Sequence, residues 1–144
     1  MLKVNVSAST TDDVGEKVSR GARRAIQNAG DAGFAVSQDE APVDEGTLLQ
    51  SGIPPEWVGG ALVWGYSAEH ARFVEEGTAA HYPPIEPLRA WARRVLGDAD
   101  AAYAIQEQIG QRGTRPQPYV QPGVDEMVRS LRSQGLSSNI DDEL

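Results

Sequence analysis

Two kinds of hydrophobic spacing divide the first third of the chain. Leu2, Val4 and Val6 alternate with polar positions over residues 1–9, which predicts a short strand. Further along, small apolar residues recur every three or four positions, at Val14, Val18, Ala22, Ala25, Ala29, Ala32 and Val36. This stripe predicts a helix of about six turns. Its small side chains allow a close approach to a sheet or to a second helix.

Polar residues and prolines mark the expected ends of this helix. Thr10-Thr11-Asp12-Asp13 supplies N-cap oxygens and places negative charge where a helix N-terminus is positive. Ala41-Pro42 is expected to end the helix, since a residue before proline avoids the α region. A turn at 44–47 then leads to residues 48–53, which are expected to be extended. Pro54-Pro55 limits any strand here to an edge or interrupted position.

The segment from Trp57 to Tyr66 is the clearest hairpin in the sequence. Gly59-Gly60 supplies the positive φ values that a two-residue turn needs, and both flanks are rich in β-forming residues. Leu62, Trp64 and Tyr66 fall on one face of the second strand, because side chains alternate along a strand.

The second half of the chain is predicted to be mainly helical. Apolar residues at helical spacing indicate helices at 68–75, 88–95, 100–109 and 124–131. Glycine is expected to end the first three, at Gly77, Gly97 and Gly110. Ala71 and either Phe73 or Val74 face inward in the first helix, and Trp91 is expected in the core. Residues 111–123 are expected to form a proline-rich loop.

The predicted fold class is α+β, with a long N-terminal helix packed on a small antiparallel β-sheet and short C-terminal helices. A chain of 144 residues suffices for one compact core, so residues 1–132 are expected to form a single α+β domain. Residues 133–144 are polar and end in Asp141-Asp142-Glu143, which predicts an acidic, flexible C-terminal tail.

The chain is acidic, with 21 Asp and Glu against 13 Lys and Arg and a formal net charge of −8. This balance disfavours binding to the outside of a nucleic-acid duplex, which requires a basic patch. Lys3 and Lys17 are the lysines of the sequence, and the other basic residues are arginines. Such usage is typical of proteins that work in strong salt or that are encoded by a GC-rich genome.

Three further features of the composition limit the function. Cysteine is absent from the sequence, which excludes disulfides and thiolate metal sites. There is no run of about 18 apolar residues and no basic segment followed by an apolar one at the start, so neither a membrane span nor a secretion signal is expected. A hydrophobic content of 40% predicts a modest core, which favours a subunit completed by copies of itself.

The candidate metal ligands are His70, Glu75, Glu76 and His81. Zinc sites usually use a tight pair such as H-E-x-x-H, whereas these histidines are eleven positions apart with Gly77-Thr78 between them. Paired carboxylates serve acid–base catalysis only where two environments separate their pKa values. The favoured interpretation is that one glutamate acts as a cap or pairs with an arginine such as Arg72 or Arg89, with the histidines at the surface.

Two arginine-containing segments are candidates for ligand binding. Gly110 to Arg115 superficially suggests a phosphate-binding loop, but it lacks the lysine and the preceding strand of such loops. Arg89, Arg93 and Arg94 flank Trp91, an arrangement compatible with nucleic acid. The favoured interpretation is that these arginines pair with acidic groups of a neighbouring subunit.

Three motifs occur in a defined order along the chain: Ala41-Pro42-Val43-Asp44-Glu45-Gly46-Thr47-Leu48 followed by Ser51-Gly52-Ile53, then His70-Ala71-Arg72-Phe73-Val74-Glu75-Glu76-Gly77-Thr78, and finally Arg115-Pro116-Gln117-Pro118-Tyr119-Val120-Gln121-Pro122-Gly123. Together they resemble the small head-to-tail joining proteins of tailed double-stranded DNA viruses, the neck or tail-completion proteins. The resemblance spans about residues 10–131. Glu45, His70, the inserted Gly52 and Gly123 depart from the family pattern.

This resemblance implies a non-enzymatic virion protein without a cofactor or a membrane partner. Its copies would form a homo-oligomeric ring, a hexamer or dodecamer, at the head–tail junction (the viral neck), after assembly in the host cytoplasm. The implied partners are portal, adaptor or head-closure proteins on one side and tail terminator or tail tube proteins on the other. Genomic DNA would pass through the channel only as cargo. The acidic composition suits such a channel. The abundance of Asp and Glu with few lysines is compatible with a halophilic archaeal virus.

The residues expected at subunit contacts or in structural loops are Asp44, Gly46, Glu75, Gly77, Thr78, Arg89, Arg93, Arg115, Pro116, Pro118, Tyr119 and Pro122. No catalytic residue is expected. Two alternatives remain open from the sequence. One is a small acidic metal-dependent hydrolase that uses His70, Glu75, Glu76 and His81. The other is a free-standing binding module that regulates another protein.

Overall fold

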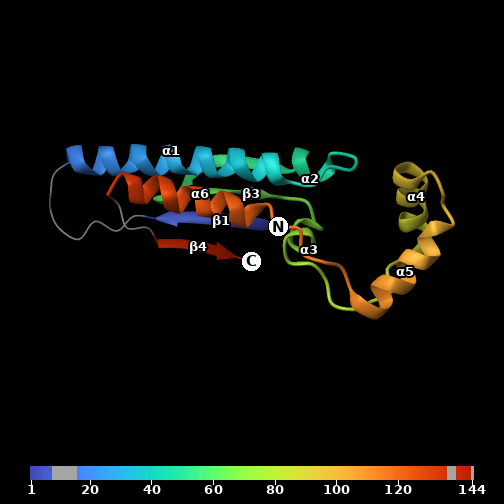
Figure 1. The fold of residues 1–144 in the computed structure, drawn as a ribbon. Coiled ribbons are helices and arrows are strands. Elements are labelled where there is room, and N and C mark those ends of the chain that lie inside the picture. Colours follow the sequence, from blue (N-terminus) through green and yellow to red (C-terminus); the bar gives the residue numbers. More distant parts are fainter. Residues whose placement is uncertain (8–15, 136–138, 144) are drawn as a thin grey trace. The chain divides into compact units, whose positions relative to one another are not determined.

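The computed structural model describes residues 1–7, 16–135 and 139–143 (Figure 1). Its elements are β1 (Leu2–Ser7), α1 (Glu16–Glu40), α2 (Thr47–Gln50), β2 (Gly52–Val58), β3 (Ala61–Tyr66), α3 (Ala71–Glu76), α4 (Ile85–Leu96), α5 (Ala101–Arg112), α6 (Val120–Ser133) and β4 (Asn139–Glu143). The α+β class with a small antiparallel sheet is confirmed. The long helix is not N-terminal, because β1 precedes it. The expected N-cap at Thr10 to Asp13 lies outside the described residues.

The strands form one antiparallel sheet in the order β2-β3-β1-β4. The predicted hairpin is confirmed, with Gly59 and Gly60 at φ 57° and 88° between β2 and β3. β1 pairs with β3 so that its three apolar side chains lie opposite those of β3, in the pairs Leu2–Tyr66, Val4–Trp64 and Val6–Leu62. All six are fully buried, so one face of the sheet carries the core.

The first proline pair acts on β2 as expected. β2 lies at the edge of the sheet, and its register shifts between Ile53 and Glu56, around Pro54-Pro55. The expectation that residues 48–53 are extended is wrong for the first part of the segment. Gly46 adopts φ 81° and the chain then makes the helical turn α2, which buries Leu48. Apolar spacing does not reveal one helical turn, because a turn of four residues covers only about one helical period and repeats nothing.

Helices α1 and α6 lie side by side over the apolar face of the sheet (Figure 1). Glycines permit the close approach. A Cβ atom at Gly33 would come within 2.7 Å of the Gly123 carbonyl oxygen, and one at Gly30 would meet the Leu62 side chain. Ala25 and Ala29 of the predicted stripe are buried, and Ile26, Gly30 and Gly33 extend the buried face of α1.

The C-terminal helices differ from expectation in their bounds. α5 continues through Gly110 to Arg112. Gly110 packs against the Tyr82 ring, where a Cβ would clash with the ring carbons. α6 begins at Val120, inside the segment expected to be a loop. Residues 139–143, expected to belong to a flexible tail, form β4 and pair with β1. None of the described helices is long and apolar enough to cross a membrane.

The chain forms two compact units where one domain was expected over residues 1–132. We call residues 1–75 and 118–144 the core unit, and Glu76–Gln117 the hairpin unit, after its two helices α4 and α5. Every residue of the main hydrophobic cluster belongs to the core unit. The helical spacing in α4 could not disclose this division, because it specifies an apolar stripe and not the surface that the stripe packs against.

Candidate functional site

Glu75 is the most constrained acidic residue of the described chain. Its side chain is 5% exposed and comes from the short helix α3. One carboxylate oxygen accepts the backbone N–H groups of Tyr119 and Val120 at 2.7 and 2.8 Å, and the other accepts that of Gln121 at 3.0 Å. The carboxylate is therefore the cap of α6, supplied from a distant part of the chain. We call this arrangement the Glu75 clasp.

The clasp satisfies the whole first turn of α6. The N-terminal end of a helix leaves four backbone positions without an intrahelical acceptor. Here these are Tyr119, Val120, Gln121 and Pro122, counted from the N-cap. The first three donate to Glu75, and proline has no N–H to donate. A negative charge at this end is also favoured by the helix dipole. The segment from Pro118 to Pro122 and the buried Glu75 side chain thus act together to cap α6.

Two buried tyrosines lie against the clasp. The Tyr119 hydroxyl donates to the Ala71 carbonyl at 2.9 Å, which ties α6 to the start of α3. The Tyr119 and Tyr66 rings meet edge to face with centroids 4.9 Å apart. The Tyr66 hydroxyl is hydrogen-bonded to Ser37 at 2.8 Å and receives the amide N–H of Gln38 at 2.9 Å. Tyrosine hydroxyls therefore link α1, β3, α3 and α6 in the core unit.

Burial and charge change the ionisation of both phenols. Desolvation raises the pKa of Tyr119 above its usual value of 10.0, and the negative charge of Glu75 raises it further. Burial also raises the pKa of Tyr66, against the opposing effect of the hydrogen bonds from Ser37 and Gln38. Both groups are thus held in the neutral form over an extended alkaline range.

A second pairing closes the base of the hairpin unit. Thr78 and Thr114 exchange backbone hydrogen bonds at 3.1 and 3.2 Å, and their hydroxyls are 2.9 Å apart. Gly77, at φ 71°, passes so close to the returning chain that a Cβ would lie 2.5 Å from the Thr114 carbonyl oxygen. Gly113, at φ 72°, approaches Thr78 in the same way. The Gly77-Thr78 pair singled out in the sequence therefore serves chain closure.

The other expected loop residues fall into two groups. Pro116, Pro118 and Arg115 are exposed in the segment that leads back to α6, and Pro122 is half-buried in its first turn. Asp44 is exposed in the turn after α1, and Gly46 supplies the positive φ at the start of α2.

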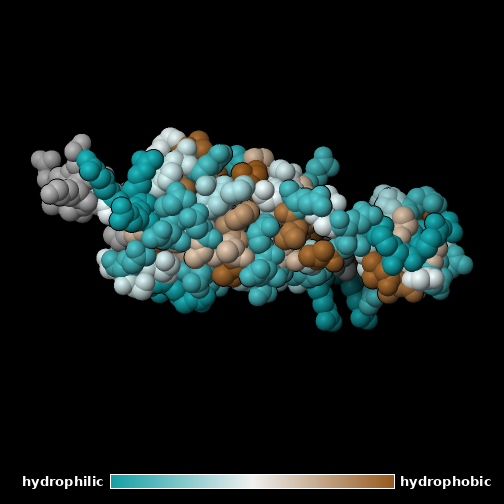
Figure 2. Space-filling view, turned by 90° about the horizontal axis from the view of Figure 1, so that it is seen from above, coloured by the Kyte–Doolittle hydropathy of each residue, from teal (hydrophilic) through white to brown (hydrophobic). Residues whose placement is uncertain are grey.

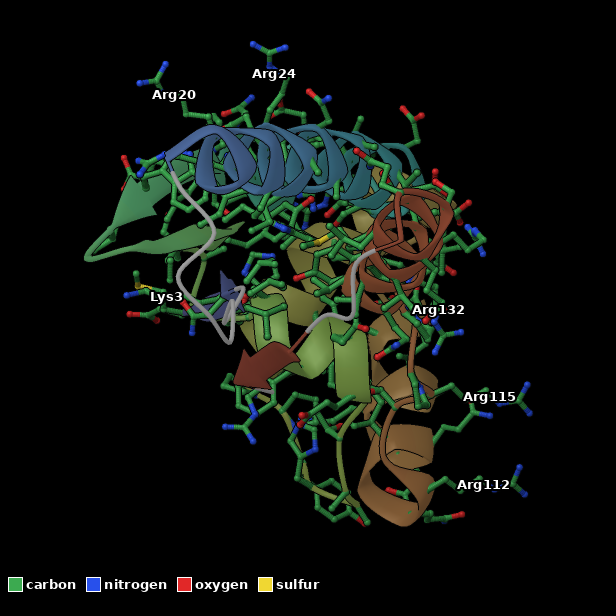
Figure 3. The ribbon with its side chains drawn as sticks, turned by 90° about the vertical axis from the view of Figure 1, so that its left-hand side faces the viewer. Lys3, Arg20, Arg24, Arg112, Arg115 and Arg132 are labelled. Atoms are coloured by element: carbon green, nitrogen blue, oxygen red, sulfur yellow. The ribbon has the colours of Figure 1, made fainter. Side chains whose placement is uncertain are left out.

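Arg89 and Arg93 lie on α4 in the hairpin unit. Arg89 pairs weakly with Glu86 at 3.6 Å and with Asp100 at 3.8 Å, which joins α4 to the start of α5. Arg93 is exposed. Figure 3 shows Arg112 and Arg115 projecting outward from the end of α5 and the segment after it. Trp91, expected in the core, is only half-buried.

The candidate metal set is not assembled. The described residues contain no group of three or more His, Asp or Glu side chains placed to hold a metal ion. The Glu75 carboxylate is already bonded to three N–H groups, His70 is exposed, and His81 is exposed with Nδ1 2.9 Å from the Ala79 carbonyl oxygen. Of the two roles weighed for a glutamate, the cap is the one that the hydrogen bonds of Glu75 confirm.

Sequence reasoning missed the polar contacts of α1. Ser37 is fully buried and Gln38 is half-buried, and both bond the Tyr66 hydroxyl. The available signal was their position beside Val36 at the end of the apolar stripe. A buried tyrosine needs a partner for its hydroxyl, but sequence spacing does not show which partner it finds.

Comparisons of the chain with protein-family models, with curated proteins and with solved structures give no match. The assignment of function therefore depends on the residues, the geometry described above and the motif resemblance.

Proposed function

We propose that this chain is a structural subunit of a tailed-virus neck, whose copies form a ring that joins the head to the tail and lets DNA pass. The observation that carries the proposal is the Glu75 clasp. It joins two of the three motifs on which the resemblance rests, although more than 40 residues separate them in the sequence. The clasp supports a structural role for these two motifs.

The distribution of charge supports the same proposal. The hairpin unit holds five arginines and five carboxylates, which cancel, whereas the core unit holds eight basic and sixteen acidic residues. The net charge of −8 therefore lies on the core unit alone. A ring whose channel is lined by core units would repel DNA along the passage, and would not retain it as a basic lining would.

Exposed apolar side chains also fit a subunit that is completed by neighbours. Phe73, beside the clasp, is 59% exposed, and Val95, Leu96 and Tyr103 of the hairpin unit are more than half exposed. Figure 2 shows hydrophobic atoms reaching the surface in both units. Large exposed apolar side chains that gather on a surface mark interaction sites more often than scattered single ones do.

The proposal is tested by the mass and symmetry of the purified chain. Native mass measurement and negative-stain imaging, over a range of protein and salt concentrations, are expected to show a closed hexamer or dodecamer. A chain that stays monomeric under every condition would contradict the proposal. The hydrolase alternative has its own test, in which His70→Ala and His81→Ala abolish metal uptake and turnover of a substrate.

A further inference from the structure

The C-terminal end of α4 carries an apolar pair that the hairpin unit leaves uncovered. Val95 and Leu96 are 51% and 53% exposed, and the exposed Arg93 precedes them on the same helix. Ala92 and Ala102 are the fully buried hydrophobic residues of this unit, all of which is described. A unit of about 40 residues with so small a core usually needs further contacts to be stable. We call Arg93 and Leu96 the hairpin tip.

Arg93 is available for a contact outside the unit. It makes no ion pair or side-chain hydrogen bond with the described residues, whereas Arg89 on the same helix is occupied by Glu86 and Asp100. Arg93 and Leu96 are three positions apart on α4 and therefore lie on the same side of the helix. An arginine beside an exposed aliphatic side chain is typical of protein–protein interfaces, where charge gives orientation and apolar area gives affinity.

The C-terminal end of α1 has the complementary properties. Asp39 and Glu40 are exposed in its last turn, which contains no basic residue. Carbonyl groups already make this end of a helix negative, so two carboxylates here are unfavourable without a cation. Neither carboxylate has a side-chain partner among the described residues. Val43, just beyond the helix, is 66% exposed. We call Asp39, Glu40 and Val43 the α1 end.

We propose that the hairpin tip of one copy docks on the α1 end of a second copy of this chain. The two surfaces match in charge and in apolar content: Arg93 meets Asp39 and Glu40, while Leu96 covers Val43. This inference rests on the proposed ring and names the contact that builds it. Because the two surfaces differ, the contact is head-to-tail. Such a contact closes into a ring when the rotation that relates one copy to the next is a whole-number fraction of a full turn.

A second copy fits better than a different partner, because the chain itself supplies both halves of the contact. The hairpin unit has no net charge, so it approaches another acidic core unit without the repulsion that two core units exert on each other. At about 0.1 M salt the Debye length is about 10 Å, so the attraction between Arg93 and the carboxylates of Asp39 and Glu40 acts at close range.

The test uses the full chain and sedimentation velocity at about 0.1 M salt. Arg93→Glu places like charges at the contact and is expected to raise the dissociation constant between copies at least about 10-fold. Arg132→Glu is the matched control, since it changes the net charge equally at an exposed residue of α6. Figure 3 shows the Arg132 side chain pointing away from the helix. Circular dichroism checks that each variant is folded.

Charge exchange makes the test specific. A second variant that combines Asp39→Arg with Glu40→Arg is expected to weaken association as Arg93→Glu does, because Arg93 then faces two arginines. An equal mixture of the two variants is expected to assemble again. In an alternating ring, the substituted carboxylate at position 93 of one variant faces the two new arginines, and Arg93 of the other faces the unchanged Asp39 and Glu40.

The outcomes separate this contact from the proposed function. Association that is weakened in each variant alone and restored in their equal mixture supports the contact. A wild-type ring that Arg93→Glu weakens no more than Arg132→Glu overturns the contact and leaves the ring standing. A wild-type chain that never associates overturns both. Capture of a different protein by the wild-type hairpin tip, with no association between copies, also overturns the contact.

Discussion

The core unit and the hairpin unit organise helices in opposite ways. In the core unit α1 and α6 pack over a sheet, with Trp64 and Tyr66 fully buried beneath them. In the hairpin unit α4 and α5 pack mainly on each other, and the side chains that are fully buried are alanines. The core unit is therefore expected to determine stability, whereas the hairpin unit presents surface. Substitutions in each unit, and excision of the hairpin helices, test this difference.

Removal of the Glu75 carboxylate is expected to have the largest effect. Glu75→Ala leaves the N–H groups of Tyr119, Val120 and Gln121 without their acceptor in a buried place. Leaving buried N–H donors without their charged acceptor costs several kcal/mol, so the free energy of unfolding should fall by roughly 3 kcal/mol. Urea denaturation measures this change. Glu75→Gln keeps one acceptor oxygen and should lose about half as much.

The neighbouring carboxylate is the control for the clasp. Glu76 follows directly on α3 and is exposed. Glu76→Ala should lower the unfolding free energy by about 1 kcal/mol at most, as expected for an exposed charged group. Equal losses for the two variants would show that Glu75 has no special role in capping α6.

The glycine contact between α1 and α6 comes next. Gly33→Ala would put a Cβ within 2.7 Å of the Gly123 carbonyl oxygen and against the Met127 side chain. Overpacking at such a site costs about 2 kcal/mol. Gly21→Ala is the matched change on the same helix, where nothing lies within 4 Å of the new Cβ. It should stabilise the chain by up to about 1 kcal/mol, because alanine favours helix.

The signs of these two changes are the decisive result, and thermal melts of both variants measure them. If Gly33→Ala stabilised the protein as Gly21→Ala does, the helices would not be in contact through Gly33. The core unit would then lack the close packing that distinguishes it from the hairpin unit.

These glycines show where prediction from sequence succeeded and where it stopped. Alternation in β1 and the Gly59-Gly60 turn correctly predicted the first strand and the β2–β3 hairpin, because strand periodicity and positive φ are local properties. Ala41-Pro42 also correctly placed the end of α1, which is at Glu40. Gly110 was interpreted as a helix end, although its role is to make room for the Tyr82 ring. A glycine that ends a helix and one that admits a neighbour are identical in sequence.

The clasp was predictable only in part. A capping role for one glutamate of the Glu75-Glu76 pair was among the interpretations, but the helix that it caps lies far along the chain and starts inside a segment expected to be a loop. The division into two units was not predicted, because both units use the same helical spacing. Long-range partners and the surface that a stripe meets are decided by tertiary packing, which no local pattern contains.

The tyrosine hydroxyls predict a dependence of stability on alkaline pH. An unfolded tyrosine ionises near pH 10, whereas the folded-state pKa values of Tyr66 and Tyr119 are raised. Above pH 10 the unfolded chain thus holds fewer protons, so the contribution of each phenol is fully present below pH 10 and is lost as pH rises toward its folded-state pKa. Unfolding free energy measured from about pH 8 to about pH 11 should fall at the alkaline end.

Phenylalanine variants assign this loss to the buried phenols. Tyr119→Phe removes the hydrogen bond to Ala71 and should cost about 1 kcal/mol at neutral pH, but it should flatten the alkaline decline. Tyr103→Phe, at an exposed position of the hairpin unit, should change stability at neutral pH by less than about 0.5 kcal/mol. A decline that Tyr119→Phe and Tyr66→Phe leave unchanged would show that other groups cause it.

Excision of the hairpin helices is expected to have the smallest effect on the core unit. Thr78 and Thr114 face each other as Val58 and Ala61 do across Gly59-Gly60, so Gly-Gly can replace residues 79–113 with a turn that the chain already uses. No residue of the excised range belongs to the main hydrophobic cluster. Unfolding free energy should therefore stay within about 0.5 kcal/mol of the full chain, while the denaturant slope falls with the smaller surface exposed.

One further substitution in the excised chain tests whether the stability of the core unit is independent of the hairpin unit. Because the Glu75 clasp lies wholly within the core unit, Glu75→Ala should cost as much in the excised chain as in the full one. Additive effects are expected for sites that share no partners. If excision alone unfolded the protein, or if it abolished the effect of Glu75→Ala, the hairpin would be part of the cooperative core. The contrast between a core that determines stability and a hairpin that presents surface would then be wrong.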